Sequence, residues 1–110
     1  MLLQETTRIG MLYDFYSPLL TERQRTLLKL YYFEDWSLGE IADYTKVSRQ
    51  AVFEAVKRAR STLDELEEKL HLLEKHQQRR KLVQQIVAAI STFPEKEKAV
   101  HLLEELLNLD

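Results

Sequence analysis

The chain has 110 residues, of which 31% are charged, a formal net charge of -2 at pH 7 and no cysteine. The absence of cysteine excludes disulfides, thiolate metal sites and cysteine nucleophiles, and the charge balance excludes a histone-like protein that coats nucleic acid through its overall charge. The length suits one domain. With two glycines and two prolines among many strong helix formers, the composition predicts an all-α fold.

No segment predicts export or membrane insertion. The first ten residues have no basic stretch ahead of their apolar residues, so a secretory signal is not expected. The longest uninterrupted apolar run that we find, Ile86 to Ile90, is far shorter than the roughly 20 residues of a membrane-spanning helix. We therefore expect a cytoplasmic protein.

Two helices are predicted in the first third of the chain. The first should end near Ser17 and Pro18, because the residue before a proline is pushed out of helical geometry. Thr21 and Gln24 have the spacing of a capping box in front of an apolar stripe. This pattern predicts a second helix from Glu22 to Phe33.

The segment SLGEIADYTKVS has the pattern of a helix-turn-helix. Ser37 and Glu40 repeat the capping-box spacing before a short helix, and Ser48 is a cap in front of a much longer one. The two helices must cross at a steep angle because no linker separates them. Ala42 is small where they should approach most closely, whereas Lys46 occupies a turn position where a positive φ angle favours glycine and costs about 1 kcal/mol.

A heptad seam runs along the long helix. Its apolar positions alternate in steps of four and three residues: Val52, Val56, Ala59, Leu63, Leu66, Leu70 and Leu73. This spacing predicts one helix from Arg49 to about Lys75 that needs a partner along its length. Two amphipathic helices predicted in the C-terminal third could fold back on the seam, or a second copy of the chain could cover it, so a homodimer stays open.

We accordingly expect one compact unit with two parts. Residues 1–75 form a helix-turn-helix domain with an extended last helix. Residues 76–110 form C-terminal helices that pack on the long helix or at a dimer interface.

The start of the long helix is the candidate nucleic-acid interface. In a helix-turn-helix, the first residues of the second helix contact base edges in the major groove, and its flanks contact phosphates. Arg49 and Gln50 can make paired hydrogen bonds to guanine and adenine, respectively. The candidate contact residues are Ser48, Arg49, Gln50, Phe53, Glu54, Lys57 and Arg58.

The same residues also have a purely structural interpretation. The first-turn side chains could be solvated, and Glu54 could pair with Lys57 or Arg58 at helical spacing. We expect Arg58 and Arg60 to contact phosphates or acidic residues of neighbouring helices. The acidic residues after Ser61 would repel a duplex, so a nucleic-acid footprint should end before that residue.

Other chemistry has little support. The basic segment from Lys75 to Lys81 is expected to be a solvated connection between helices. Neither adjacent pair of histidines has the spacing of four that places two ligands on one helix face, so no metal and no other cofactor is expected. Without a phosphate-binding glycine loop, a nucleophile elbow or a convincing acid pair, the sequence does not predict an enzyme. The aromatic residues from Tyr31 to Trp36 should pack in the core, with Tyr32 or Trp36 partly exposed.

Three motifs in this order, FYSPLLTERQ, LYYFEDWSLGEIAD and VSRQAVFEAVKR, resemble the YlxM family of small bacterial proteins, whose helix-turn-helix is similar to region four of sigma factors. The resemblance covers about residues 13–75. It implies an all-α fold with a sigma region four-like helix-turn-helix, a long recognition helix and two C-terminal helices. Residues Ser48 to Val52 match the family's motif, and the resemblance implies that Arg49 and Gln50 are the exposed residues that contact bases. Phe53 stands where we expect tyrosine in relatives, and Lys46 where glycine is common.

The resemblance also implies a functional context. Genes of this family tend to lie beside those for the signal recognition particle GTPases, so we expect a regulatory DNA-binding protein with a role in that pathway. The alternative is an adaptor that docks on the particle's GTPase or on RNA polymerase without reading DNA. A third hypothesis is recognition of the particle's RNA, which would require a bulge or loop because the major groove of an RNA duplex is too deep and narrow for a helix.

Overall fold

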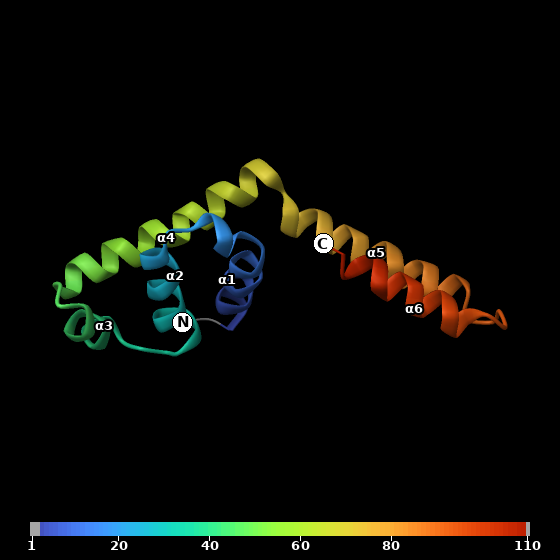
Figure 1. The fold of residues 1–110 in the computed structure, drawn as a ribbon, viewed down its shortest axis with the longest axis horizontal. Helices are drawn as coiled ribbons and strands as arrows, with labels where there is room; N and C mark the ends of the chain where they lie inside the picture. Colours follow the sequence, from blue (N-terminus) through green and yellow to red (C-terminus); the bar gives the residue numbers. More distant parts are fainter. Residues whose placement is uncertain (1–2, 110) are drawn as a thin grey trace. The chain divides into compact units, whose positions relative to one another are not determined.

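A computed structural model of the protein describes residues 3–109. These residues form the helices α1 (Leu3–Tyr16), α2 (Glu22–Leu28), α3 (Leu38–Thr45), α4 (Arg49–Leu70), α5 (Leu72–Ala89) and α6 (Lys96–Leu107), shown in Figure 1. A short 3₁₀ turn, η1 (Ser17–Leu19), follows α1, and a π-helical turn, η2 (Lys29–Phe33), continues α2. The all-α prediction is confirmed, as is the end of the first helix next to Ser17 and Pro18.

The chain divides into two compact units, an N-terminal unit (Met1–His71) and a C-terminal unit (Leu72–Asp110). The prediction that the long helix continues to about Lys75 is wrong. α4 ends at Leu70 because His71 adopts a left-handed conformation, with φ 55°, and its N–H bonds to the carbonyl of Glu67 at 2.8 Å. A left-handed residue of this kind is a common way to end a helix.

Both predicted capping boxes are present in the N-terminal unit. The Thr21 hydroxyl accepts from the N–H of Gln24 at 3.1 Å, and the Gln24 side chain accepts from the N–H of Thr21 at 3.0 Å. Ser37 and Glu40 make the same reciprocal pair at 3.0 Å in each direction. These bonds satisfy amides that have no partner within the helix, so they fix where α2 and α3 begin.

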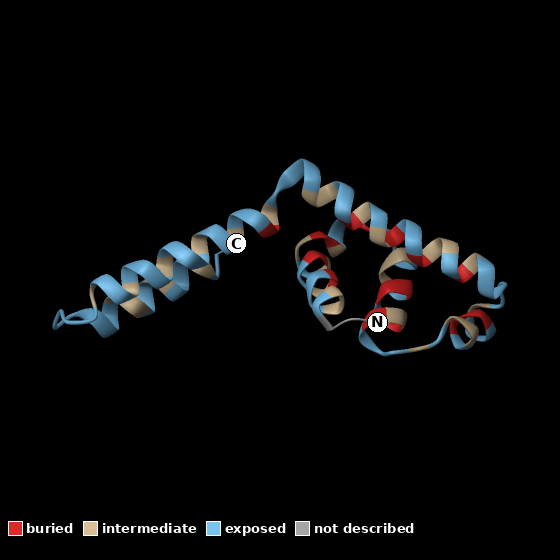
Figure 2. Ribbon diagram, turned by 180° about the vertical axis from the view of Figure 1, so that it is seen from behind, coloured by how far each residue is buried: buried red, intermediate tan, exposed pale blue. Residues whose placement is uncertain are grey.

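The core of the N-terminal unit lies where α4 packs against α1, α2 and α3. Figure 2 shows the buried residues of α4 on one face of the helix. The seam positions Val52, Val56, Ala59 and Leu63 are all buried, whereas Leu70 is 42% exposed. We expected the C-terminal helices or a second copy to cover the seam, but its first four positions are covered by the helices that precede α4 in the chain.

Two polar contacts join α1 to the acidic end of α4. The fully buried Tyr16 donates its phenolic hydrogen to the carboxylate of Glu67 at 2.6 Å. Arg8 pairs with Asp64 at 3.0 Å on the surface. The acidic end of α4 thus contacts α1 through two of its carboxylates.

The aromatic residues before α3 pack as expected, with one change. Trp36 is partly exposed and lies edge-on to Tyr44 of α3, with ring centroids 5.4 Å apart. Tyr32 is buried, and the more exposed ring is that of Phe33, at 39%.

The C-terminal unit is a helical hairpin in which α5 and α6 lie side by side and run in opposite directions (Figure 1). The segment from Lys75 to Lys81 lies within α5, so the prediction that it connects two helices is wrong. Nothing in this segment breaks a helix, because its lysine, arginine and glutamine residues are good helix formers. Among residues 72–109, Leu73 alone is buried.

Candidate nucleic-acid interface

The arrangement of α3, the turn and α4 is that of a helix-turn-helix. Three residues separate the helices, and Lys46 takes the expected left-handed conformation, with φ 62°. Its neighbour Val47 donates its N–H to the carbonyl of Ala42 at 3.2 Å. The side chain of Val47 remains 36% exposed, whereas Ala42 and Val52 are buried. The turn therefore holds the start of α4 at a fixed angle to α3 while its own side chains face solvent.

Ser48 begins α4 as predicted. Its hydroxyl accepts a hydrogen bond from the N–H of Ala51 at 3.0 Å. Because a hydroxyl has a second lone pair and a hydrogen, it can cap the helix and still donate to another group. The first turn of α4 contains no acidic residue, so the positive end of the helix dipole is not neutralised there.

The two predicted base-reading residues lie exposed in the first turn. Arg49 precedes Gln50, and the Gln50 amide donates to the carboxylate of Glu54 one turn later, at 3.1 Å. Glu54 is therefore bonded to Gln50 rather than to Lys57 or Arg58, the partners that helical spacing also allowed. This bond holds the Gln50 side chain along the helix surface.

The remaining predicted contact residues follow on the same helix. Phe53 is 45% exposed, and Lys57 and Arg58 are exposed as well. The structure thus places all seven candidates on the cap and the first three turns of α4. The side chains of Arg49, Gln50, Lys57 and Arg58 are exposed there, whereas the fourth cation of this region, Arg60, is only partly exposed.

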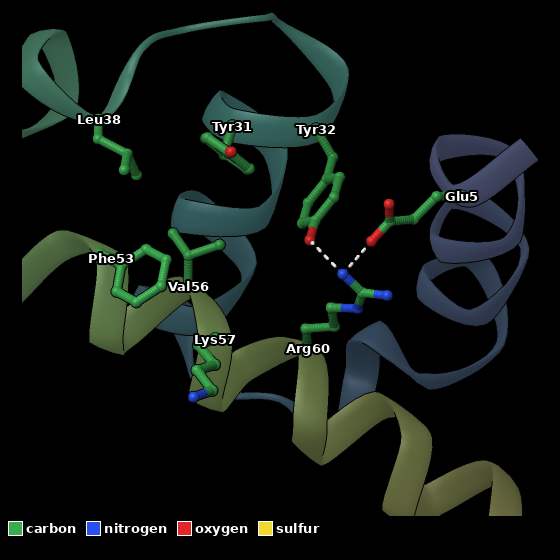
Figure 3. A pocket seen from close by; sticks show the side chains of 8 residues that line it. All are labelled: Glu5, Tyr31, Tyr32, Leu38, Phe53, Val56, Lys57 and Arg60. Atoms are coloured by element: carbon green, nitrogen blue, oxygen red, sulfur yellow. Dashed lines mark hydrogen bonds and ion pairs between the residues drawn. The ribbon is translucent and has the colours of Figure 1, made fainter. Parts of the chain in front are cut away.

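A cavity of about 420 Å³ lies beside these residues (Figure 3). It is formed between α1, η2, the start of α3 and α4, and it is lined by Glu5, Tyr31, Tyr32, Leu38, Phe53, Val56, Lys57 and Arg60. Its lining combines apolar and aromatic side chains with the charged residues Glu5, Lys57 and Arg60. No pattern in the sequence indicates this cavity, because its lining comes from four separate elements.

Arg60 forms the polar side of the cavity. Its guanidinium pairs with the carboxylate of Glu5 and donates to the hydroxyl of Tyr32 at 3.5 Å, as drawn in Figure 3. Burial raises the pKa of Tyr32 and outweighs the opposite effect of Arg60, so the phenol stays protonated. The expectation that Arg60 contacts an acidic residue of a neighbouring helix is confirmed, and this contact fastens α1 to α4.

The N-terminal unit therefore defines the class of this protein. A short capped helix, a three-residue turn and a longer helix with an exposed basic start make it a helix-turn-helix protein. Within residues 3–109, no helix is both long and apolar enough to cross a membrane, and no group of three or more acidic or histidine side chains could hold a metal ion.

Comparison with known proteins agrees with this class. The family model described as "Putative helix-turn-helix protein, YlxM / p13 like" matches residues 3–103, and the chain belongs to this family, UPF0122. A UPF0122 protein of Oceanobacillus iheyensis is 51% identical over 85 residues, which cover 77% of this chain and 81% of the relative. A UPF0122 protein of Bacillus cereus strain AH187 is 54% identical over 82 residues, 74% of each chain. The resemblance inferred from the three motifs is confirmed.

Proposed function

We propose that this protein is a cytoplasmic, non-enzymatic regulator that reads DNA with the start of α4 and takes part in the signal recognition particle pathway. The observation that carries the proposal is the exposure of Arg49, Gln50, Lys57 and Arg58 at the capped end of the second helix of a helix-turn-helix. The main acidic cluster of α4 begins only at Asp64. Positive and hydrogen-bonding groups thus gather at the end of α4 that enters the major groove in this class of protein.

Each side chain has a role that follows from its chemistry. Arg49 can form two hydrogen bonds to guanine, and Gln50 can do the same with adenine once it releases Glu54. Lys57 and Arg58 supply the phosphate contacts on which affinity depends. Ser48 caps the start of α4, and the N–H groups of this first turn would point toward the phosphates of the duplex. Such N–H groups at the start of a helix attract an anion.

The remaining two candidates act through shape and selectivity. Phe53 offers an apolar surface of the kind that contacts the methyl group of thymine. Glu54 can accept a hydrogen bond from the amino group of cytosine, and it repels phosphates from its side of the helix. Phe53 and Glu54 therefore contribute to base preference rather than to general affinity.

The decisive experiment is a mobility shift with the double variant Arg49→Ala/Gln50→Ala on a selected DNA site. Each paired contact discriminates by about 1–3 kcal/mol, so the sequence-specific affinity should fall by at least about 30-fold while the circular dichroism spectrum stays unchanged. The matched control, Gln78→Ala/Arg80→Ala, removes the same residue types from α5 and should bind as the wild type does. Retained specific binding by the first variant would overturn the proposal.

The dependence of DNA affinity on salt concentration tests the phosphate contacts separately. Lys57→Ala should weaken binding to all sequences about equally and reduce the slope of log affinity against log salt by about 1. A change of sequence preference without a change of slope would show that Lys57 contacts a base instead.

The pathway assignment depends on the resemblance to the YlxM family and needs a test of its own. A pull-down from lysate, with and without nuclease, identifies both proteins and nucleic acids that associate with the chain. Competition between the selected DNA and the particle's RNA at two salt concentrations then separates DNA reading from RNA reading. Failure to recover any component of the particle would remove the pathway from the proposal and leave DNA reading untouched.

A protein-binding adaptor is the second candidate function, and the cavity beside Phe53 favours it. The cavity is partly apolar, and its lining includes Lys57, so it offers the anchor and the charge that a docking peptide segment uses. The partner would be the GTPase of the particle or RNA polymerase. This candidate predicts an association that survives nuclease and the double variant Arg49→Ala/Gln50→Ala, and that is lost in Phe53→Asp.

A further inference from the structure

The C-terminal unit has an apolar surface that the proposed function does not use. Six large hydrophobic side chains of this unit are 44–81% exposed: Leu82, Ile86, Phe93, Leu102, Leu106 and Leu109. Figure 2 shows how much of α5 and α6 is exposed. A soluble monomer rarely leaves so many large apolar side chains together on one surface.

The four of these side chains that belong to the helices, Leu82, Ile86, Leu102 and Leu106, lie on one side of the hairpin. The contact between α5 and α6 uses partly buried residues such as Val83 and Val87 on α5 and Leu103 and Leu107 on α6. In both helices each exposed apolar residue comes one position before a contact residue, for example Leu82 before Val83. One position along a helix is a rotation of about 100° about its axis, so both exposed stripes are rotated from the contact by the same angle. Because the two helices are antiparallel, that shared rotation points both stripes to the same side.

The opposite side of the hairpin is polar. Positions one residue after the contact stripe carry groups such as Gln84 on α5 and Glu104 on α6, and both are exposed. The hairpin is thus a two-helix layer with one apolar and one polar surface. We call the side with Leu82, Ile86, Leu102 and Leu106 the apolar face.

The hairpin also has almost no core of its own. It spans residues 72–109, and Leu73 is its one buried residue. Chains below about 40 residues usually need a disulfide, a metal or association with another chain to fold. The chain has no cysteine, so association is the source of stability that fits.

The charges at the ends of the apolar face indicate what covers it. Lys75 precedes Leu82 by seven residues, and Glu95 precedes Leu102 by seven, so both extend the apolar stripes. Both are exposed. They lie at opposite ends of the hairpin, because α5 begins where α6 ends. The face therefore carries a positive side chain, Lys75, at one end and a negative side chain, Glu95, at the other.

We propose that the apolar faces of two copies of this chain pack together as a four-helix bundle, with the two hairpins running in opposite directions. Two layers of two helices with apolar inner sides are the arrangement of such a bundle. The opposite direction brings Lys75 of each copy toward Glu95 of the other, and it places the middle of each α5 near the symmetry axis. The dimer then supplies the core that a single hairpin lacks.

Sedimentation of the full chain tests the dimer. The wild type should sediment as a dimer at micromolar concentration, and the variant Leu82→Glu/Leu106→Glu should raise the dimer dissociation constant at least about 100-fold. The matched control Gln77→Glu/Gln84→Glu adds the same charge on the polar side and should stay dimeric. A wild type that remains monomeric at high micromolar concentration, because another part of the same chain covers the face, would overturn the proposal.

A second measurement is independent of whether the glutamate variants fold. Because the chain has no cysteine, Leu82→Cys introduces a single thiol near the symmetry axis, and a mild oxidant should link two copies there. Gln84→Cys, on the polar side, should give little linked dimer. Equal linking of the two variants, or none in Leu82→Cys, would overturn the opposed arrangement.

Charge reversal gives a third readout. Lys75→Glu and Glu95→Lys should each weaken the dimer several-fold, and the double variant should recover. Since these residues lie at opposite ends of one hairpin, recovery requires two chains. A double variant no tighter than either single variant would refute the pairing.

Discussion

The left-handed backbone of Lys46 predicts that glycine at this position stabilises the N-terminal unit. Lys46 has φ 62° at the turn between α3 and α4, and its side chain is exposed. A residue with a Cβ atom pays a steric cost in this conformation, which glycine avoids. Replacing the exposed side chain removes little packing, so the backbone effect should dominate.

The size of the effect follows from two opposing terms. The left-handed conformation costs a residue with a Cβ about 1–2 kcal/mol, and the greater freedom of glycine in the unfolded chain costs about 0.4–1 kcal/mol. The free energy of unfolding should therefore rise by about 0.5–1 kcal/mol in Lys46→Gly. For a unit of this size, that corresponds to an increase of about 2–8 °C in melting temperature.

Trp36 provides the assay. It is the one tryptophan of the chain, and it packs on Tyr44 within the N-terminal unit, so its fluorescence during urea denaturation reports on this unit. Lys46→Ala is the control, because it removes the lysine side chain beyond Cβ and keeps the steric cost. Glycine should be more stable than alanine here by about 0.5–1 kcal/mol. If alanine were equal to or more stable than glycine, the argument from backbone strain would be wrong.

Three further predictions concern the contacts that fix the helices. Tyr16→Phe should lower the free energy of unfolding by about 1–3 kcal/mol in urea denaturation, because the phenol donates to the Glu67 carboxylate at 2.6 Å; an unchanged value would mean that water replaces this bond at no cost. Ser48→Ala should cost about 1 kcal/mol through loss of the cap on α4, and Ser48→Asp should restore most of it in thermal melts. Hydrogen bonding to Ser37 holds the pKa of Glu40 below its ordinary value of 4.5. The larger effect comes from the backbone of Ser37 and the smaller one from its hydroxyl. Its carboxylate therefore stabilises the fold above pH 4.5, and this contribution disappears as the pH falls through the lowered pKa. The stability advantage of the wild type over Glu40→Gln should shrink over that acid range, and an advantage independent of pH would contradict the assignment.

The sequence predicted well the features that depend on neighbouring residues. The caps at Thr21, Ser37 and Ser48 are short-range patterns, so the starts of α2, α3 and α4 could be placed to the residue. The end of α4 could not be placed, because His71 adopts a left-handed conformation without a glycine to signal it. Asp35 is also left-handed, with φ 56°, and no glycine indicates it.

Contacts between distant segments were predicted less well. The heptad seam identified the buried stripe of α4 from Val52 to Leu63, but a stripe does not specify which helix covers it. The start of α4 was recognised as a candidate interface because its residues are adjacent in sequence. The cluster of Arg60, Glu5 and Tyr32 and the cavity beside it arise from residues far apart in the chain. No local pattern could have paired them.

The distribution of charge along α4 has a consequence for how the protein meets a large anion. Four of its five cationic residues precede Ser61, and four of its five acidic residues follow it. The side chains therefore add to the dipole of the peptide groups instead of opposing it, which disfavours the isolated helix. Packing against α1, α2 and α3 stabilises the helix despite this. In the field of a polyanion such a combined dipole experiences a torque, so the molecule turns its Ser48 end forward before any contact forms.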